Sequence, residues 1–155
     1  MKNNTLKRVK FDYNKEAGIT LCTINMGNDG YFYGTAICHP DDKDMCSELT
    51  GQTIAHMRAN ISYLEFLRDM RIKPGLKALK QLYASTNRSK KFKVDSYEAK
   101  MMRSQIGVYE RDLADVKEAL KFLRQDLKDY INIKDEKYKV IRKKRKAIEL
   151  GLDEM

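Results

Sequence analysis

The chain has 155 residues, of which 42% are hydrophobic and 34% charged, with two prolines, no tryptophan and a formal net charge of +9. This length predicts about one domain, and the composition excludes a loop-rich or disordered chain. No window is apolar enough for a membrane span, and the N-terminus lacks the apolar run of a signal peptide. The positive charge favours polyanionic partners, although a lysine-rich helical surface gives the same total for solubility alone.

The first forty residues predict a small antiparallel sheet of about three strands. Apolar side chains alternate with charged ones at Val9, Phe11 and Tyr13. Residues 19–26 are rich in β-branched side chains, and residues 31–38 supply a returning strand. Between them lies GNDG, residues 27–30, whose side chains tolerate the positive φ of a tight turn. Such a sheet needs an element to cover its apolar face, and the next helix is the expected cover.

Two helices are predicted after the sheet. From Gln52 onward, helical spacing of three and four connects Ile54, Met57, Ile61, Leu64 and Leu67. Pro74 and Gly75 predict a break or a kink near Lys73. A short second helix follows over residues 75–84, and residues 85–95 form a polar, basic loop.

The last segment predicts one long helix, from Asp95 to Ile148, with Asp95 and Glu98 as a capping box. Such a helix would be roughly 80 Å long. Apolar side chains form a heptad seam over four repeats: Met102, Ile106, Tyr109, Leu113, Val116, Leu120, Leu123, Leu127 and Tyr130. Beyond Tyr130 lysines enter this register, so the tight seam is expected to end there. A hairpin near residues 130–137 is the alternative to a continuous helix.

The fold class expected from these elements is α+β: a small N-terminal antiparallel sheet, then helices, with a long coiled-coil-like helix at the C-terminus. Residues 1–94 would hold the sheet and the first helices, and residues 95–155 the long basic helix, together one structural unit. The first helices are too short to cover the seam. We therefore expect a homodimer or higher homo-oligomer with paired C-terminal helices.

The stretch ICHPDDKDMCSE, residues 37–48, looks most like a site of chemistry. Cys38 and His39 are adjacent on a strand and point to opposite faces, and no second Cys/His cluster completes a zinc site. The aspartates lack the glycine and glutamate of a calcium loop. We therefore expect no metal here, but a joint in which Asp42, Asp44 or Ser47 caps the next helix.

Three cysteines, Cys22, Cys38 and Cys46, make an odd count without a CxxC pair. This pattern predicts free thiols in a reducing, cytosolic setting. No P-loop, GxGxxG, GxSxG or HExxH motif occurs, and only two histidines are present. We therefore expect no enzyme activity and no cofactor.

The basic loop NRSKKFK, residues 87–93, interleaves cations with an aromatic ring, a pattern that suits a phosphate beside a base or ribose. The ligand-binding residues expected around it are Asn87, Arg88, Lys91, Phe92, Tyr97 and Arg103. A solvated loop anchored by Phe92 is the alternative. Arg58, in the first helix, is expected to add a buried cation, or else to pair with the acidic turn.

The C-terminal block is also basic, with eight Lys or Arg among the thirteen residues 134–146. On a helix these cations would surround most of the circumference, which suits nucleic-acid backbone phosphates. A solvated, frayed helix end is the alternative.

Residues 35–61, TAICHPDDKDMCSELTGQTIAHMRANI, resemble a segment of small phage and prophage proteins of Gram-positive bacteria. In those proteins a strand ends in a Cys-His-Pro-acidic turn and a Gly-x-x-Ile-Ala-x-x-Arg-Ala helix follows. The matching positions are Cys38, His39, Pro40, Asp41, Asp42, Gly51, Ile54, Ala55, Arg58 and Ala59. The likeness extends over about residues 35–106.

The chain is also similar to the first Thoeris anti-defence family, which consists of phage proteins that oligomerise and sequester cyclic ADP-ribose-type signals or cyclic oligonucleotides. This resemblance implies a counter-defence protein of the host cytoplasm that binds a phosphate-bearing nucleotide between protomers. The alternatives are a nucleic-acid-binding phage protein, an inhibitor of a CRISPR effector, and a scaffold without a ligand.

Overall fold

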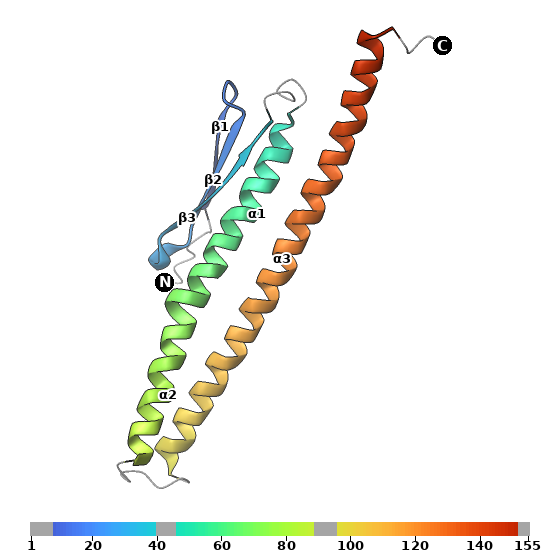
Figure 1. Cartoon of the computed structure of the whole chain (residues 1–155). Coiled ribbons are helices and arrows are strands. Elements are labelled where there is room, and N and C mark those ends of the chain that lie inside the picture. Colours follow the sequence, from blue (N-terminus) through green and yellow to red (C-terminus); the bar gives the residue numbers. More distant parts are fainter. Residues whose placement is uncertain (1–7, 40–45, 89–95, 152–155) are drawn as a thin grey trace. The chain divides into compact units, whose positions relative to one another are not determined.

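The structure, a computed structural model, describes residues 8–39, 46–88 and 96–151. Three strands come first and helices follow (Figure 1). The elements are β1 (Arg8–Asn14), β2 (Ile19–Asn25), η1 (Gly27–Asp29), β3 (Tyr31–Ile37), α1 (Glu48–Phe66), η3 (Leu67–Ile72), α2 (Lys73–Arg88) and α3 (Tyr97–Glu149). The strands form one antiparallel sheet in the order β1-β2-β3. The predicted α+β class, with a long C-terminal helix, is confirmed.

The chain divides into two compact units. The first comprises Met1–Ser62 with Leu123–Met155, and the second comprises Tyr63–Phe122. The sheet, most of α1 and the C-terminal part of α3 therefore belong to one unit. The end of α1, η3, α2 and the N-terminal part of α3 belong to the other.

The hairpin between β2 and β3 turns at the predicted GNDG. Its 3₁₀ turn η1 covers Gly27–Asp29, and both flanking glycines have positive φ, 67° at Gly27 and 91° at Gly30. The Met26 N–H donates to the Gly30 carbonyl over 2.9 Å, which closes the turn. A glycine at each end relieves the steric cost that a side chain would have in this backbone region.

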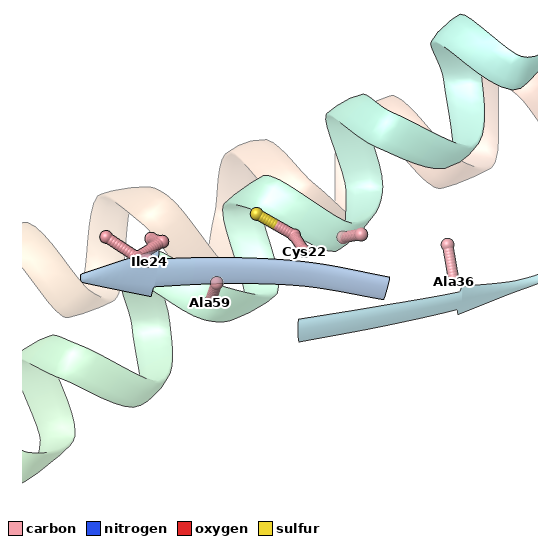
Figure 2. Close-up of a cluster of buried hydrophobic side chains, with 5 residues drawn as sticks. Cys22, Ile24, Ala36 and Ala59 are labelled. Carbon is pink, nitrogen blue, oxygen red and sulfur yellow. The ribbon is translucent and has the colours of Figure 1, made fainter. Parts of the chain in front are cut away.

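The sheet buries one face under α1. Along β2, Thr20, Cys22 and Ile24 are buried, which is the alternation expected of a half-buried strand. Figure 2 shows this cluster, with Cys22 and Ile24 of β2, Ala36 of β3 and Ala59 of α1. The first helix is thus the cover that the sequence predicts.

The side chains by which α1 meets the sheet are not the predicted large ones. Ala55 and Ala59 are fully buried, whereas Ile54, Met57 and Ile61 are only half-buried. A Cβ on Gly34 would collide with the Ala55 carbonyl and the Ala59 N–H. Because the helix backbone lies so close to β3, only small residues fit at the contact.

The free edge of β3 also contacts α1. Arg58 Nη1 donates to the Thr35 carbonyl over 2.7 Å, and Ser62 Oγ donates to the Tyr33 carbonyl over 3.3 Å. Arg58 remains exposed. The expectation of a buried cation is therefore wrong, because the guanidinium satisfies an edge carbonyl at the surface.

Serine hydroxyls cap two helices. The Thr50 N–H donates to Ser47 Oγ over 3.3 Å at the start of α1, so Ser47, one of the three predicted candidates, caps this helix; Asp42 and Asp44 lie outside the described residues. At the start of α3 the Ala99 N–H donates to Ser96 Oγ over 3.2 Å, so Ser96 caps α3. The predicted cap, Asp95, lies outside the described residues.

The predicted kink near Lys73 takes the form of a π-helical segment, η3. The Lys73 N–H donates to the Arg68 carbonyl, five residues back. Pro74 has no N–H to donate, and its ring would collide with the carbonyl four residues before it. The wider π turn gives that carbonyl room, so the backbone passes from α1 into α2 without a break.

The long helix α3 is continuous over 53 residues, which excludes the hairpin alternative. The predicted seam is its less exposed side: Leu120 is buried and the other eight seam residues are half-buried. The half-buried stripe runs on through Ile131, Lys134 and Tyr138. The heptad register itself ends after Tyr130 as predicted, because Lys137 and Lys144 in that register are exposed, whereas Ile131 and Tyr138 lie one position away from it.

The expectation of three free thiols is wrong. Cys38 and Cys46 form a disulfide with their Cα atoms 6.2 Å apart, within the usual range for such a bond. Cys22 is free and buried in the core, and its burial raises the pKa of its thiol. The prediction relied on the missing CxxC spacing, but the bonded cysteines lie eight positions apart in the sequence.

Candidate functional site: a cationic cavity in the first unit

A cavity of about 370 Å³ lies in the first unit. Its walls come from three places in the sequence. The sheet contributes Tyr13, Thr20 and Ala36, and the joint and α1 contribute residues from Cys38 to Arg58. The third wall is α3, beyond Tyr130. One chain supplies all of these walls.

The α3 wall is one side of the helix. Its lining residues are spaced by three, one, three, one and three, so they share a face: Ile131, Lys134, Asp135, Tyr138, Lys139 and Arg142. Three of these side chains are cationic and one is anionic. With Arg58 from α1, the lining residues that the structure describes include four cations and one carboxylate, so their formal charge is positive even without His39.

The start of α1 adds further positive potential. Ser47, Thr50 and Gly51 line the cavity, and they belong to the cap and first turn of the helix. The aligned peptide dipoles of a helix give its N-terminus a partial positive charge. Gly51 packs against Thr20, because a Cβ at Gly51 would lie only 2.5 Å from Thr20 Oγ1. The helix start is therefore held close to β2.

Two tyrosines lie among the cations. Tyr13 projects from β1 and Tyr138 from α3, and both line the cavity. A third ring, that of Tyr130, lies 5.4 Å from Lys134 Nζ in a cation–π contact. Rings beside cations suit a ligand that combines a flat, π-rich group with phosphate.

Of the predicted ligand-binding residues, Arg58 is the one that lines this cavity. Asn87 and Arg88 end α2, and Lys91 and Phe92 lie outside the described residues. Tyr97 is the first residue of α3 and is exposed.

The remaining predicted residue, Arg103, belongs to the second unit. Its Nη1 donates to the Tyr83 hydroxyl over 3.3 Å, so α2 and the start of α3 are joined there.

Sequence reasoning missed most of the cavity. It treated Cys38, His39 and Ser47 as a joint, yet all three line the cavity as well as joining β3 to α1. It treated Lys134, Lys139 and Arg142 as part of a basic block around the helix. The available signal was the helical spacing of these cations with Ile131 and Tyr138, which puts them on one side of α3, although this side departs from the heptad register of the seam.

In residues 8–39, 46–88 and 96–151, no three His, Cys, Asp or Glu side chains are grouped so that they could hold a metal ion. Over the same ranges, no helix has the length and apolar character needed to cross a membrane. Comparison with protein-family models, with curated proteins and with solved structures finds no match for this chain.

Proposed function

We propose that this chain is a non-enzymatic binding protein that sequesters a small phosphate-bearing nucleotide in the cavity of its first unit. The observation that carries the proposal is the composition of the described part of the cavity wall: four cationic side chains, one carboxylate and two tyrosines around about 370 Å³. Small-molecule sites in proteins commonly measure about 300–1,000 Å³. The cavity is therefore large enough for a nucleotide-sized ligand.

Each kind of wall residue has a role in this proposal. Lys139, Arg142 and the exposed guanidinium of Arg58 would bind phosphate oxygens by charge-assisted hydrogen bonds. Tyr13 or Tyr138 would stack on the base. Asp135, the carboxylate among the described lining residues, would accept hydrogen bonds from ribose hydroxyls or an exocyclic amine.

Binding without catalysis agrees with the chemistry of the wall. The two thiols that line the cavity are bonded to each other, so neither is available as a nucleophile in this form. The resemblance of residues 35–106 to phage and prophage proteins supplies the biological setting. In that setting the ligand is a nucleotide signal of bacterial immunity, a cyclic ADP-ribose isomer or a cyclic oligonucleotide, and the protein acts in the cytoplasm of the host.

Calorimetric titration with ADP-ribose, cyclic ADP-ribose isomers and cyclic dinucleotides tests the proposal. We expect one panel member to bind, and Lys139→Ala to weaken its binding by about 10-fold or more, since a hydrogen bond to a charged group contributes roughly 1.5–3 kcal/mol. Lys137→Ala is the matched control. It removes the same charge from the same helix at an exposed position outside the cavity wall.

Other results would point elsewhere. Silence across the panel would overturn the proposal. Loss of binding in Arg88→Ala or Arg103→Ala, with Lys139→Ala unaffected, would move the site to the junction of α2 and α3.

The exposed cations beyond the cavity wall favour nucleic acid as a second candidate ligand, through Lys137, Lys143, Lys144, Arg145 and Lys146. Duplex or single-stranded DNA would then bind with an affinity that falls steeply with salt. In that case Lys137→Ala would weaken binding as much as Lys139→Ala does.

A further inference from the structure

The disulfide between Cys38 and Cys46 joins two of the cavity's walls. Cys38 directly follows β3, and its N–H donates to the Gly18 carbonyl over 2.8 Å, so its backbone extends the sheet. Cys46 directly precedes Ser47, the cap of α1. The bond therefore connects the end of the sheet to the start of the helix.

Each of the two bonded cysteines is attached to a different element: Cys38 to the sheet and Cys46 to the start of α1. On the sheet side, a Cβ at Gly18 would lie 3.2 Å from Cys38 Cβ, so the two strand ends are in tight contact. On the helix side, Ser47, Thr50 and Gly51 follow Cys46 and line the cavity with it. A covalent bond between Cys38 and Cys46 thus fixes the first turn of α1 against the sheet, where the helix N-terminus meets the cavity.

We propose that the thiol–disulfide state of Cys38 and Cys46 controls ligand binding in the cavity, the bonded form being the one that binds tightly. This inference rests on the proposed binding function. The bonded form holds its wall in place before the ligand arrives, and such preorganisation lowers the entropic cost of binding. In the reduced form Cys38 and Cys46 are not linked, so only non-covalent contacts hold the first turn of α1 against the sheet.

The exchange needs a disulfide-bearing co-reactant such as oxidised glutathione. The thiolate of one cysteine attacks a sulfur of the co-reactant and releases the first glutathione thiolate. The second cysteine then attacks the mixed disulfide and releases the other. One S–S bond forms in the protein and one breaks in the co-reactant, and the two thiol protons end on the two glutathione molecules.

The third cysteine provides an internal comparison. Cys22 is fully buried, and its burial raises the pKa of its thiol, which keeps it in the unreactive protonated form. Cys38 and Cys46 are half-buried and line a cavity. Exchange is therefore expected at the cavity pair and not in the core.

The test compares the full chain after treatment with oxidised glutathione and after treatment with a phosphine reductant. Mass spectrometry reports whether the bond forms, through the loss of two hydrogen atoms and a peptide that links Cys38 to Cys46. Calorimetry then measures the Kd for ADP-ribose, the cyclic ADP-ribose isomers and pyrophosphate, the last as a generic polyanion. We expect reduction to weaken binding by about 10-fold, equivalent to about 1.4 kcal/mol.

Two variants show which cysteines cause the redox response of ligand binding. Cys38→Ser/Cys46→Ser should bind as weakly as the reduced wild type under both conditions, and Cys22→Ala should keep the full redox response. Equal affinity in both states, with the bond verified by mass, would overturn the redox control and leave the proposed binding intact. If the disulfide between Cys38 and Cys46 does not form, the redox control is overturned, whether or not a ligand binds. Absence of binding by every probe in both states would overturn the proposed function and the control together.

Discussion

Gly34 sets how closely α1 approaches the sheet. Any side chain there would begin with a Cβ inside the backbone of α1, at the Ala55 carbonyl and the Ala59 N–H. Neither atom can rotate away, because both belong to the helix backbone. The close contact between α1 and β3 therefore depends on the hydrogen that glycine carries in place of a side chain.

We predict that Gly34→Ala destabilises the protein by about 1–3 kcal/mol, the usual cost of overpacking a core. Gly107→Ala is the matched control. It makes the same chemical change in α3, where an added Cβ meets nothing within 4 Å, and should stabilise by about 0.5–1 kcal/mol. Urea denaturation monitored by circular dichroism measures both changes. A Gly34→Ala protein as stable as the wild type would contradict the close contact.

At the scale of the elements, the π-helical segment η3 contains a carboxylate, Asp69, whose pKa is strongly lowered. Arg68 donates to both oxygens of Asp69, over 2.8 Å from Nε and 3.0 Å from Nη2, and Lys73 Nζ lies 3.5 Å from Asp69 Oδ1. The hydrogen bond from Arg68, with the charges of Arg68 and Lys73, lowers the pKa of Asp69 to about 2.

This lowered pKa predicts how the stability of the fold changes with pH. The pKa in the folded state lies below the unfolded value of about 3.9, so the ion pair contributes stability above about pH 4. That contribution is lost as the pH falls from about 4 toward 2. Titration of the Asp69 carboxyl carbon by NMR should give a midpoint near 2. In Arg68→Gln the midpoint should rise toward the unfolded value. A wild-type midpoint near 3.9 would contradict the interaction.

The sequence predicted those elements that local chemistry determines. The glycines of GNDG specify their own turn, Ser47 caps its own helix, and the seam from Met102 to Tyr130 repeats within one helix. Each of these signals involves residues close together in the sequence. They are therefore readable without knowing what the chain packs against.

The features that sequence analysis missed depend on residues far apart in the chain. The contact of Gly34 with Ala55 follows from the shapes of two surfaces, and alanines carry no periodic signal of their own. The cavity combines Tyr13, Ser47 and Tyr138, which no spacing rule connects. The cations were visible as a basic block, but which of them line a cavity is decided by packing.

At the scale of the whole molecule, α3 leaves apolar side chains exposed beside its seam. Met101, Val108 and Phe122 are exposed and are separated by multiples of seven residues, so they form a line along the helix that the charged Asp115 interrupts. Exposed apolar lines of this kind commonly mark surfaces where proteins associate. This line favours the self-association that the seam alone led us to expect.

We therefore predict that light scattering at high protein concentration reports at least twice the chain mass of 18.1 kDa. Phe122→Glu should return the protein to a single chain, because it places a charge on the exposed line. Ile148→Glu is the control, an exposed apolar residue of the same helix with the same change. A mass of one chain at every concentration would refute self-association.

The hydrogen bonds from Arg58 and Ser62 to β3 also protect that edge of the sheet, one of its two, against the addition of a further strand. An edge strand with unoccupied carbonyls is a template on which another chain can add a strand and begin to aggregate. Here the carbonyls of Thr35 and Tyr33 already accept hydrogen bonds from α1, so an incoming strand finds these acceptors occupied. The helix that covers the face of the sheet thus also protects its edge, and Arg58 protects against misassembly in addition to lining the cavity.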